Sequence, residues 1–175
     1  MKIEDHELAG VAAIKNLKYV GEIREDSYKR AVLHSYNAAV HLYLDGYYPA
    51  AVQNAHWCAD MAVKLFLWKK HLVNYTDYHN LPMVRILNWM PKQEEMKQTI
   101  DNLRELHSLY EQFGDYMEMV EEYPQHLFGT EKQDLFVEKI ENVPAIKEGA
   151  RKAILLLDIS LPHLLDFEQK NAQNI

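Results

Sequence analysis

The chain has 175 residues and a formal net charge of −7, with 48% apolar and 26% charged residues. This length fits one domain, and the ordinary globular composition excludes bulk disorder and collagen-like or low-complexity sequence. Six glycines and six prolines are too few for a turn-rich all-β fold, and a single cysteine, Cys58, excludes an intrachain disulfide and a cysteine-rich zinc site.

The first residues of the chain are acidic and lack the basic and apolar regions of a signal peptide. The longest apolar runs, over 62–68 and 154–159, are far shorter than the roughly 20 residues that cross a bilayer. We therefore expect a cytoplasmic protein that does not span a membrane. A first helix is predicted over 4–20, although Gly10 disfavours it.

The next predicted element is a helix that begins at an N-cap, Asp26 or Ser27, and ends at Asp45. Apolar residues recur along this segment at helical spacing. Gly46 then supplies the left-handed residue that commonly follows a helix, and Pro49 suits the first turn of the following one.

Residues 49–72 are predicted to form a central helix, because the segment is apolar on two faces. Its small side chains allow neighbouring helices to approach closely. The polar residues Gln53, Asp60 and Lys64 occupy the rest of its surface, and Asp60 and Lys64 have the favourable acid-first i,i+4 order. The first apolar stripe is Val52, Ala55, Ala59, Ala62, Val63 and Phe66, and the second is Ala51, Cys58, Leu65 and Leu72.

A short helix and a long one are predicted next. Asn80 caps the short helix, and Pro91 ends it. The long helix is amphipathic, covers residues 92–120 and is loosened near Gly114.

The remaining sequence predicts a loop over 121–129, a helix from Glu131, and a last helix that starts at Asn142-Val143-Pro144 and runs to Ser160. Residues 161–175 are expected to be a tail. The predicted fold class is all-α: an up-and-down bundle of four to five main helices in a single domain over residues 1–160.

Charge is unevenly distributed along the chain. Residues 1–91 carry ten Lys and Arg against nine Asp and Glu, a net +1, whereas residues 92–175 carry nine against seventeen, a net −8. Because nucleic-acid binding depends on cations that neutralise phosphates, any such contact is expected in the first half, near Lys64, Lys69 and Lys70.

The nine histidines do not form a recognisable metal motif. His34 and His41 would lie roughly 10.5 Å apart along one helix, too far to hold one ion. His56 and Asp60 could chelate at i,i+4, but the sequence contains no HExxH motif and no paired Glu-x-x-His repeats. We expect no metal and no cofactor. Cys58 lies on an apolar face, where packing is its ordinary role.

The segment from Gly46 to Leu67 resembles the core of HEPN domains (higher eukaryotes and prokaryotes nucleotide-binding). In that family a short G-x-Y turn joins two helices, and the second helix carries an A-x-E-x-x-x-K-A signature. Here Gly46 opens the turn, Asp60 stands at the acidic position, and Lys64 stands at the lysine position.

Two further motifs extend the resemblance over roughly residues 28–160. His79-Asn80-Leu81 reproduces the H-x-L that often follows the signature in this family. Glu122-Tyr123-Pro124 lies where many members have R-Y-P before a final helix, with His126 close behind. The resemblance therefore implies a ligand-binding set of Asp60, Lys64, His79, Tyr123 and His126.

Many HEPN proteins are metal-independent RNases with an R-x4-6-H motif, whose chemistry needs an acid or base near the 2′-OH and a cation for the developing charge. This sequence departs from that motif. Arg30 and His34 are separated by three residues, and Arg104 and His107 by two. Glu122 replaces the arginine of R-Y-P, which reverses the charge there. These departures favour a catalytically inactive member.

The expected function is therefore binding of a nucleotide, an RNA or a protein partner. The resemblance implies a homodimer, to which Tyr47, Tyr48 and Trp57 could contribute. It also implies a toxin–antitoxin-like arrangement with a nucleotidyltransferase-type protein.

Two other functions stay open. The first is a divergent HEPN ribonuclease in which Lys64 or Arg30 meets His34 or His79 only in the folded dimer. The second is a purely structural interaction module with no small ligand.

Overall fold

A computed structural model of the protein describes residues 23–70, 81–114 and 143–165. These residues contain five α-helices and no strand, so the all-α prediction is confirmed. None of these helices combines the length and apolar composition needed to cross a membrane. The elements are α2 (Ile23–Leu44), α3 (Tyr48–Lys69), α5 (Met83–Ile86), the 3-10 helix η2 (Leu87–Trp89), α6 (Glu94–Leu109), the π-helix η3 (Tyr110–Gly114) and α10 (Val143–Leu165).

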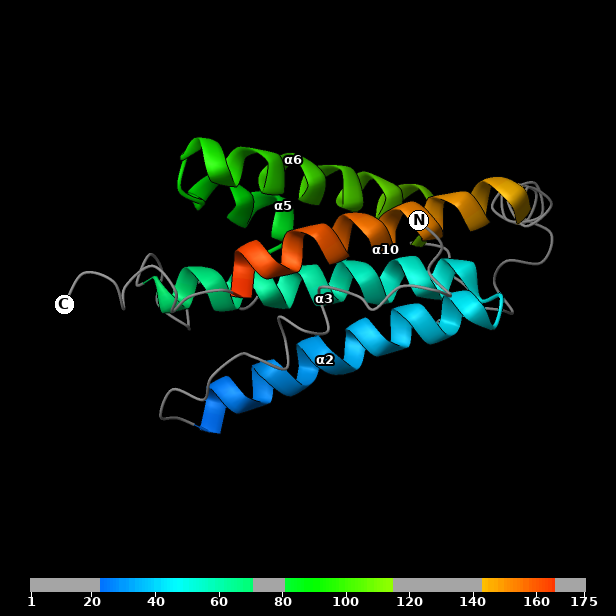
Figure 1. The fold of residues 1–175 in the computed structure, drawn as a ribbon, viewed down its shortest axis with the longest axis horizontal. Helices are drawn as coiled ribbons and strands as arrows, with labels where there is room; N and C mark the ends of the chain where they lie inside the picture. The colour runs from blue at the N-terminus through cyan, green and yellow to red at the C-terminus, as the bar shows by residue number, and fades with distance from the viewer. Residues whose placement is uncertain (1–22, 71–80, 115–142, 166–175) are drawn as a thin grey trace.

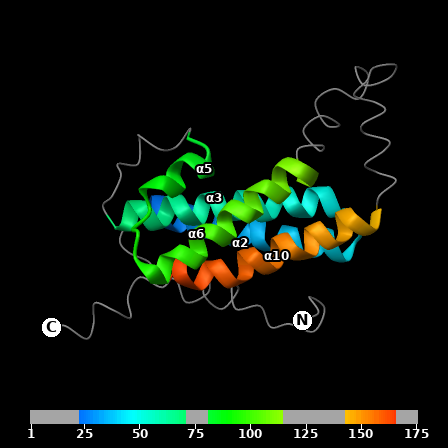
Figure 2. The ribbon, with the colours of Figure 1, turned by 90° about the horizontal axis from the view of Figure 1, so that it is seen from above.

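Helix α3 lies at the centre of the bundle, as its two apolar stripes predict. Figure 1 shows α3 between α2 on one side and α10 on the other, with α6 and α5 on the α10 side. Seen from above in Figure 2, α6 crosses over α3 and α10. Helix α3 contacts α2, α5, α6, η3 and α10.

The turn between α2 and α3 forms as its residues predict. Gly46 has a φ of 87°, a left-handed conformation that favours glycine. Its N–H donates to the carbonyl of Tyr43 at 3.1 Å, and the N–H of Tyr47 donates to that of Leu42 at 2.8 Å. This pair of bonds is a Schellman motif, which satisfies two free carbonyls at the end of α2. Pro49 lies in the first turn of α3.

Both predicted N-caps are wrong. Helix α2 begins at Ile23, so Asp26 and Ser27 lie inside it. Helix α5 begins after Pro82, which takes an extended conformation, and not after Asn80. The fixed φ of proline suits a residue that precedes a helix.

The last helix is longer than expected. Helix α10 starts at Val143, as predicted, but continues through Pro162 to Leu165 and therefore includes residues assigned to the tail. The side chains of Leu161, Leu164 and Leu165 are buried in the core. The free energy gained by burying these three side chains offsets the loss of the backbone hydrogen bond that a proline inside a helix removes. The helices predicted over 4–20 and from Glu131, and the loop over 121–129, lie outside the described residues.

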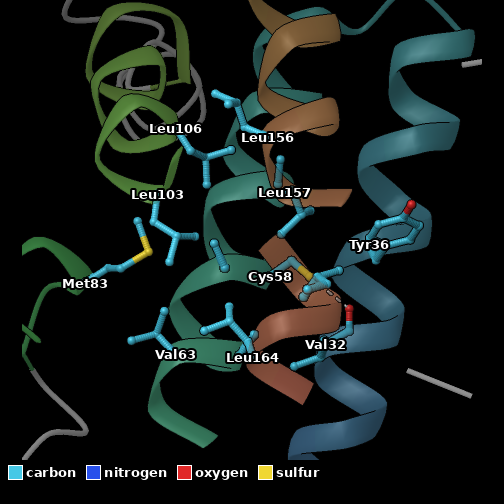
Figure 3. Close-up of a cluster of buried hydrophobic side chains, with 14 of the residues drawn as sticks. Val32, Tyr36, Cys58, Val63, Met83, Leu103, Leu106, Leu156, Leu157 and Leu164 are labelled. Atoms are coloured by element: carbon cyan, nitrogen blue, oxygen red, sulfur yellow. Dashed lines mark hydrogen bonds between the residues drawn. The ribbon is translucent and has the colours of Figure 1, made fainter. Parts of the chain in front are cut away.

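Both apolar stripes of α3 are buried up to Phe66, and Leu72 lies outside the described residues. Figure 3 shows Cys58 pointing toward Val32 of α2, while Val63 faces the side of Met83. The Cys58 thiol donates to the Val32 carbonyl at 3.3 Å, and burial raises the pKa of that thiol. Cys58 is therefore a packing residue, as predicted.

The long helix changes its winding where Gly114 was expected to loosen it. After Leu109 the α-helix becomes the π-helix η3. Two glycines make room for its aromatic rings: a Cβ on Gly114 would lie 2.6 Å from the Tyr110 ring, and a Cβ on Gly149 of α10 would overlap the Phe113 ring. The π-helix is thus packed against both α3 and α10.

Candidate functional site

A row of polar side chains runs along α3 on one face. Gln53, His56, Asp60 and Lys64 follow one another at spacings of three and four residues, which places them on one side of the helix. Gln53, His56 and Lys64 are only 5%, 9% and 7% exposed. Polar residues so deeply buried need partners inside the protein. We call these four residues the polar ridge.

The lysine of the ridge is neutralised by its neighbour. The Lys64 ammonium donates to the Asp60 carboxylate at 2.6 Å, and the Lys64 side chain is nine-tenths buried. The structure therefore brings these two predicted site residues together. In this arrangement Lys64 stabilises the carboxylate and does not present a free cation at the surface.

The histidine of the ridge meets a second histidine from α6. Nε2 of His56 lies 3.0 Å from Nδ1 of His107. The His56 ring stacks on the Tyr110 ring of the π-helix, with centroids 4.2 Å apart and planes 11° from parallel. On its other side, Nε2 of His107 lies 3.4 Å from the carboxylate of Glu111. The π-helix thus supplies both a ring and a carboxylate to the cluster.

The positions of the protons follow from these partners when both histidines are neutral. The Glu111 carboxylate can only accept, so Nε2 of His107 carries its proton. Nδ1 of His107 is then unprotonated and accepts from the Nε2–H of His56. This leaves Nδ1 of His56 as a bare acceptor, and that buried atom has no hydrogen-bond partner among the described residues. An unpaired acceptor costs less than an unpaired N–H at the same place.

The environment of His56 holds the ring neutral. Burial, followed by repulsion from His107 and Lys64, lowers the pKa of His56 to about 3. A proton added at Nδ1 would place a charge in a buried site where that atom has no acceptor. His56 therefore acts as a neutral, oriented ring at physiological pH.

The structure tests only part of the predicted site. Asp60 and Lys64 form one pair, whereas His79, Tyr123 and His126 lie outside the described residues. No group of three His, Cys, Asp or Glu side chains within the described ranges is arranged to hold a metal ion. His56, which was considered as a chelating partner of Asp60, contacts His107 instead.

The other basic groups considered from the sequence are spread out. Of the three clustered lysines, Lys64 is buried, Lys69 is half-buried and Lys70 is exposed. Arg30 and His34 are both exposed, one turn apart on α2.

Comparison with protein-family models, with curated proteins and with solved structures gives no match to this chain. The polar ridge carries an internally paired lysine and a neutral histidine, both withdrawn from solvent. Such a ridge orients and stabilises the helices more readily than it binds a phosphate.

Proposed function

We propose that this protein is a catalytically inactive, HEPN-like helical bundle that acts by binding a protein partner and that forms a homodimer through α3. The supporting observation is a partly exposed stripe on α3 that contains two tryptophans, Trp57 and Trp68, on an otherwise largely buried helix. Nucleotide or RNA binding, and pairing with a nucleotidyltransferase-type protein, remain predictions from the resemblance alone.

The stripe consists of Asn54, Trp57, Met61 and Trp68, and we call it the α3 stripe. Their spacings of three, four and seven residues place these side chains along one face of α3. Trp57 is 47% exposed, and the other three are half-buried. Tryptophan and methionine are enriched at the centres of protein interfaces, where they contribute much of the binding energy.

Charge favours a second copy of the chain as the occupant. The α3 stripe carries no charged side chain, and Asp60 and Lys64 beside it neutralise each other. Two such faces can therefore meet around a two-fold axis without repulsion between like charges. A nucleic acid is a less favourable occupant, because its phosphates would be repelled by a chain with a net charge of −7.

The aromatic residues expected at a dimer interface differ in their exposure. Tyr47 and Trp57 are exposed, whereas Tyr48 is half-buried and packs its ring 5.6 Å from that of Tyr43. Of these three residues only Trp57 lies on the α3 stripe, so it is the anchor expected for an interface through α3, and Tyr48 contributes to the fold.

We expect the purified protein to be a dimer and Trp57→Glu to be a monomer by analytical ultracentrifugation. The substitution would bury a charge at the centre of the interface, which two copies cannot compensate. Trp89→Glu is the matched control, because Trp89 is 46% exposed and lies on η2, an element that carries none of the stripe residues. A monomeric wild-type protein, or equal effects of both substitutions, would contradict the proposed dimer.

We also expect no cleavage of RNA oligomers by the pure protein. Lys64 is held by Asp60 and His56 is withdrawn from solvent, so neither is placed to act on a phosphodiester. The assay is electrophoresis of labelled RNA with EDTA present. Robust cleavage that is lost in His34→Ala or His126→Ala would overturn the proposal and establish the ribonuclease alternative.

A further inference from the structure

We propose that a groove between η2 and α6 binds a small phosphate monoester. The groove has a volume of about 430 Å³, within the usual range of small-molecule sites. It lies on different elements from the polar ridge and the α3 stripe. The inference therefore does not depend on the homodimer.

Three cations line the groove on a chain that is acidic overall. They are Lys92, Lys97 and Arg104, and Asp101 is the one acidic residue that lines it with them. The formal charge of the lining is thus +2. A phosphate monoester carries a charge of about −1.5 to −2 at pH 7, which this lining would neutralise.

The existing ionic contacts of these cations are long and solvent-exposed. Lys97 lies 3.7 Å from the carboxylate of Glu94, and both side chains are largely exposed. Nη1 of Arg104 lies 3.7 Å from Asp101, and Nη2 lies 3.5 Å from the side-chain oxygen of Asn88. Exposed pairs at such distances contribute little stability, so a phosphate that makes shorter, bidentate contacts would compete well for the guanidinium.

The remaining lining of the groove is apolar. Leu87 and Met90 are buried in the core and Ile100 is half-buried, so each presents only a small part of its surface to the groove. A ligand would therefore place its phosphate on the cations and a less polar part against these side chains. A confined site of this size suits a small molecule, whereas RNA would need an extended cationic surface.

The test is titration calorimetry of the full chain at low ionic strength. The probes are AMP and ribose 5-phosphate, which separate a nucleotide from a sugar phosphate, together with adenosine, which lacks the phosphate. At least one of the phosphates is expected to bind, and adenosine is not. Arg104→Gln and Lys97→Gln are each expected to weaken binding about tenfold, as the loss of one charge-assisted contact would.

Lys147→Gln is the matched control, because Lys147 is an exposed lysine on α10 outside the groove and should leave binding unchanged. Circular dichroism will verify that each variant is folded, and Lys92→Gln replaces any variant that is not. The proposal is overturned if neither phosphate binds at millimolar concentration, if adenosine binds as well as AMP, or if the groove variants bind like the wild type.

Discussion

Acidification from pH 7 to pH 5 is expected to destabilise this protein by about 2 kcal/mol through His56 alone. The pKa of His56 is about 3 in the folded protein and about 6.5 in the unfolded chain. Between these values the unfolded state binds the proton and the folded state does not, so stability falls as the pH falls. The contribution is fully present above pH 6.5 and is lost progressively down to about pH 3.

Urea unfolding at pH 7, 6 and 5 measures this effect. His56→Gln keeps a donor that can face His107 but cannot titrate, so its stability should fall by about 2 kcal/mol less than that of the wild type over the same range. His34→Gln is the control, because His34 is exposed on α2. If His56→Gln and the wild type lose stability in parallel, the prediction that His56 stays neutral in the folded protein is wrong.

The second large effect is expected at the hydrogen bond between α2 and α10. The Tyr36 hydroxyl donates to the Asp158 carboxyl at 2.7 Å, and both side chains are buried. Burial, and then this bond, raises the pKa of Tyr36 far above its ordinary range, so the hydroxyl remains the donor. Tyr36→Phe is expected to cost about 2–3 kcal/mol, because a buried acidic group loses a hydrogen-bond donor.

A double-mutant cycle separates this bond from simple packing. Asp158→Leu should also destabilise the protein, but the double variant Tyr36→Phe/Asp158→Leu should be more stable than the sum of the single losses predicts. Replacing both partners removes the two polar groups that each single substitution deprives of this hydrogen bond. The measurement is the unfolding free energy of all four proteins in urea. Additive losses would show that the hydrogen bond contributes nothing beyond packing.

Short sequence patterns predicted the parts of the fold that depend on neighbouring residues, namely the turn before α3 and the central position of α3. Gly46 and Pro49 fixed the turn before α3, since each has a conformational preference of its own. The two apolar stripes identified α3 as the central helix. The same local reading failed at Pro162, where the burial of Leu164 and Leu165 outweighs the preference of proline to end a helix.

The sites depend on contacts that no short pattern contains. His56 and His107 are 51 residues apart, and their pairing requires α6 to pack on α3. The i,i+4 spacing of His107 and Glu111 was the available signal for this cluster, but it is common on helix surfaces. The groove was missed for another reason: its three cations are close together in the sequence, but they lie in the half of the chain with a net charge of −8, which predicts a poor surface for phosphates.

The distance in sequence between Tyr36 and Asp158 has a consequence for biosynthesis. The two residues are 122 positions apart, so α2 and α3 leave the ribosome long before α10 exists. Helix α3 ends at Lys69 and α10 begins 74 positions later at Val143, so at about 5–20 residues per second this interval lasts roughly 4–15 seconds. During it the nascent hairpin exposes the apolar surface that α10 will later cover, so we expect the hairpin to be prone to aggregation until α10 is made.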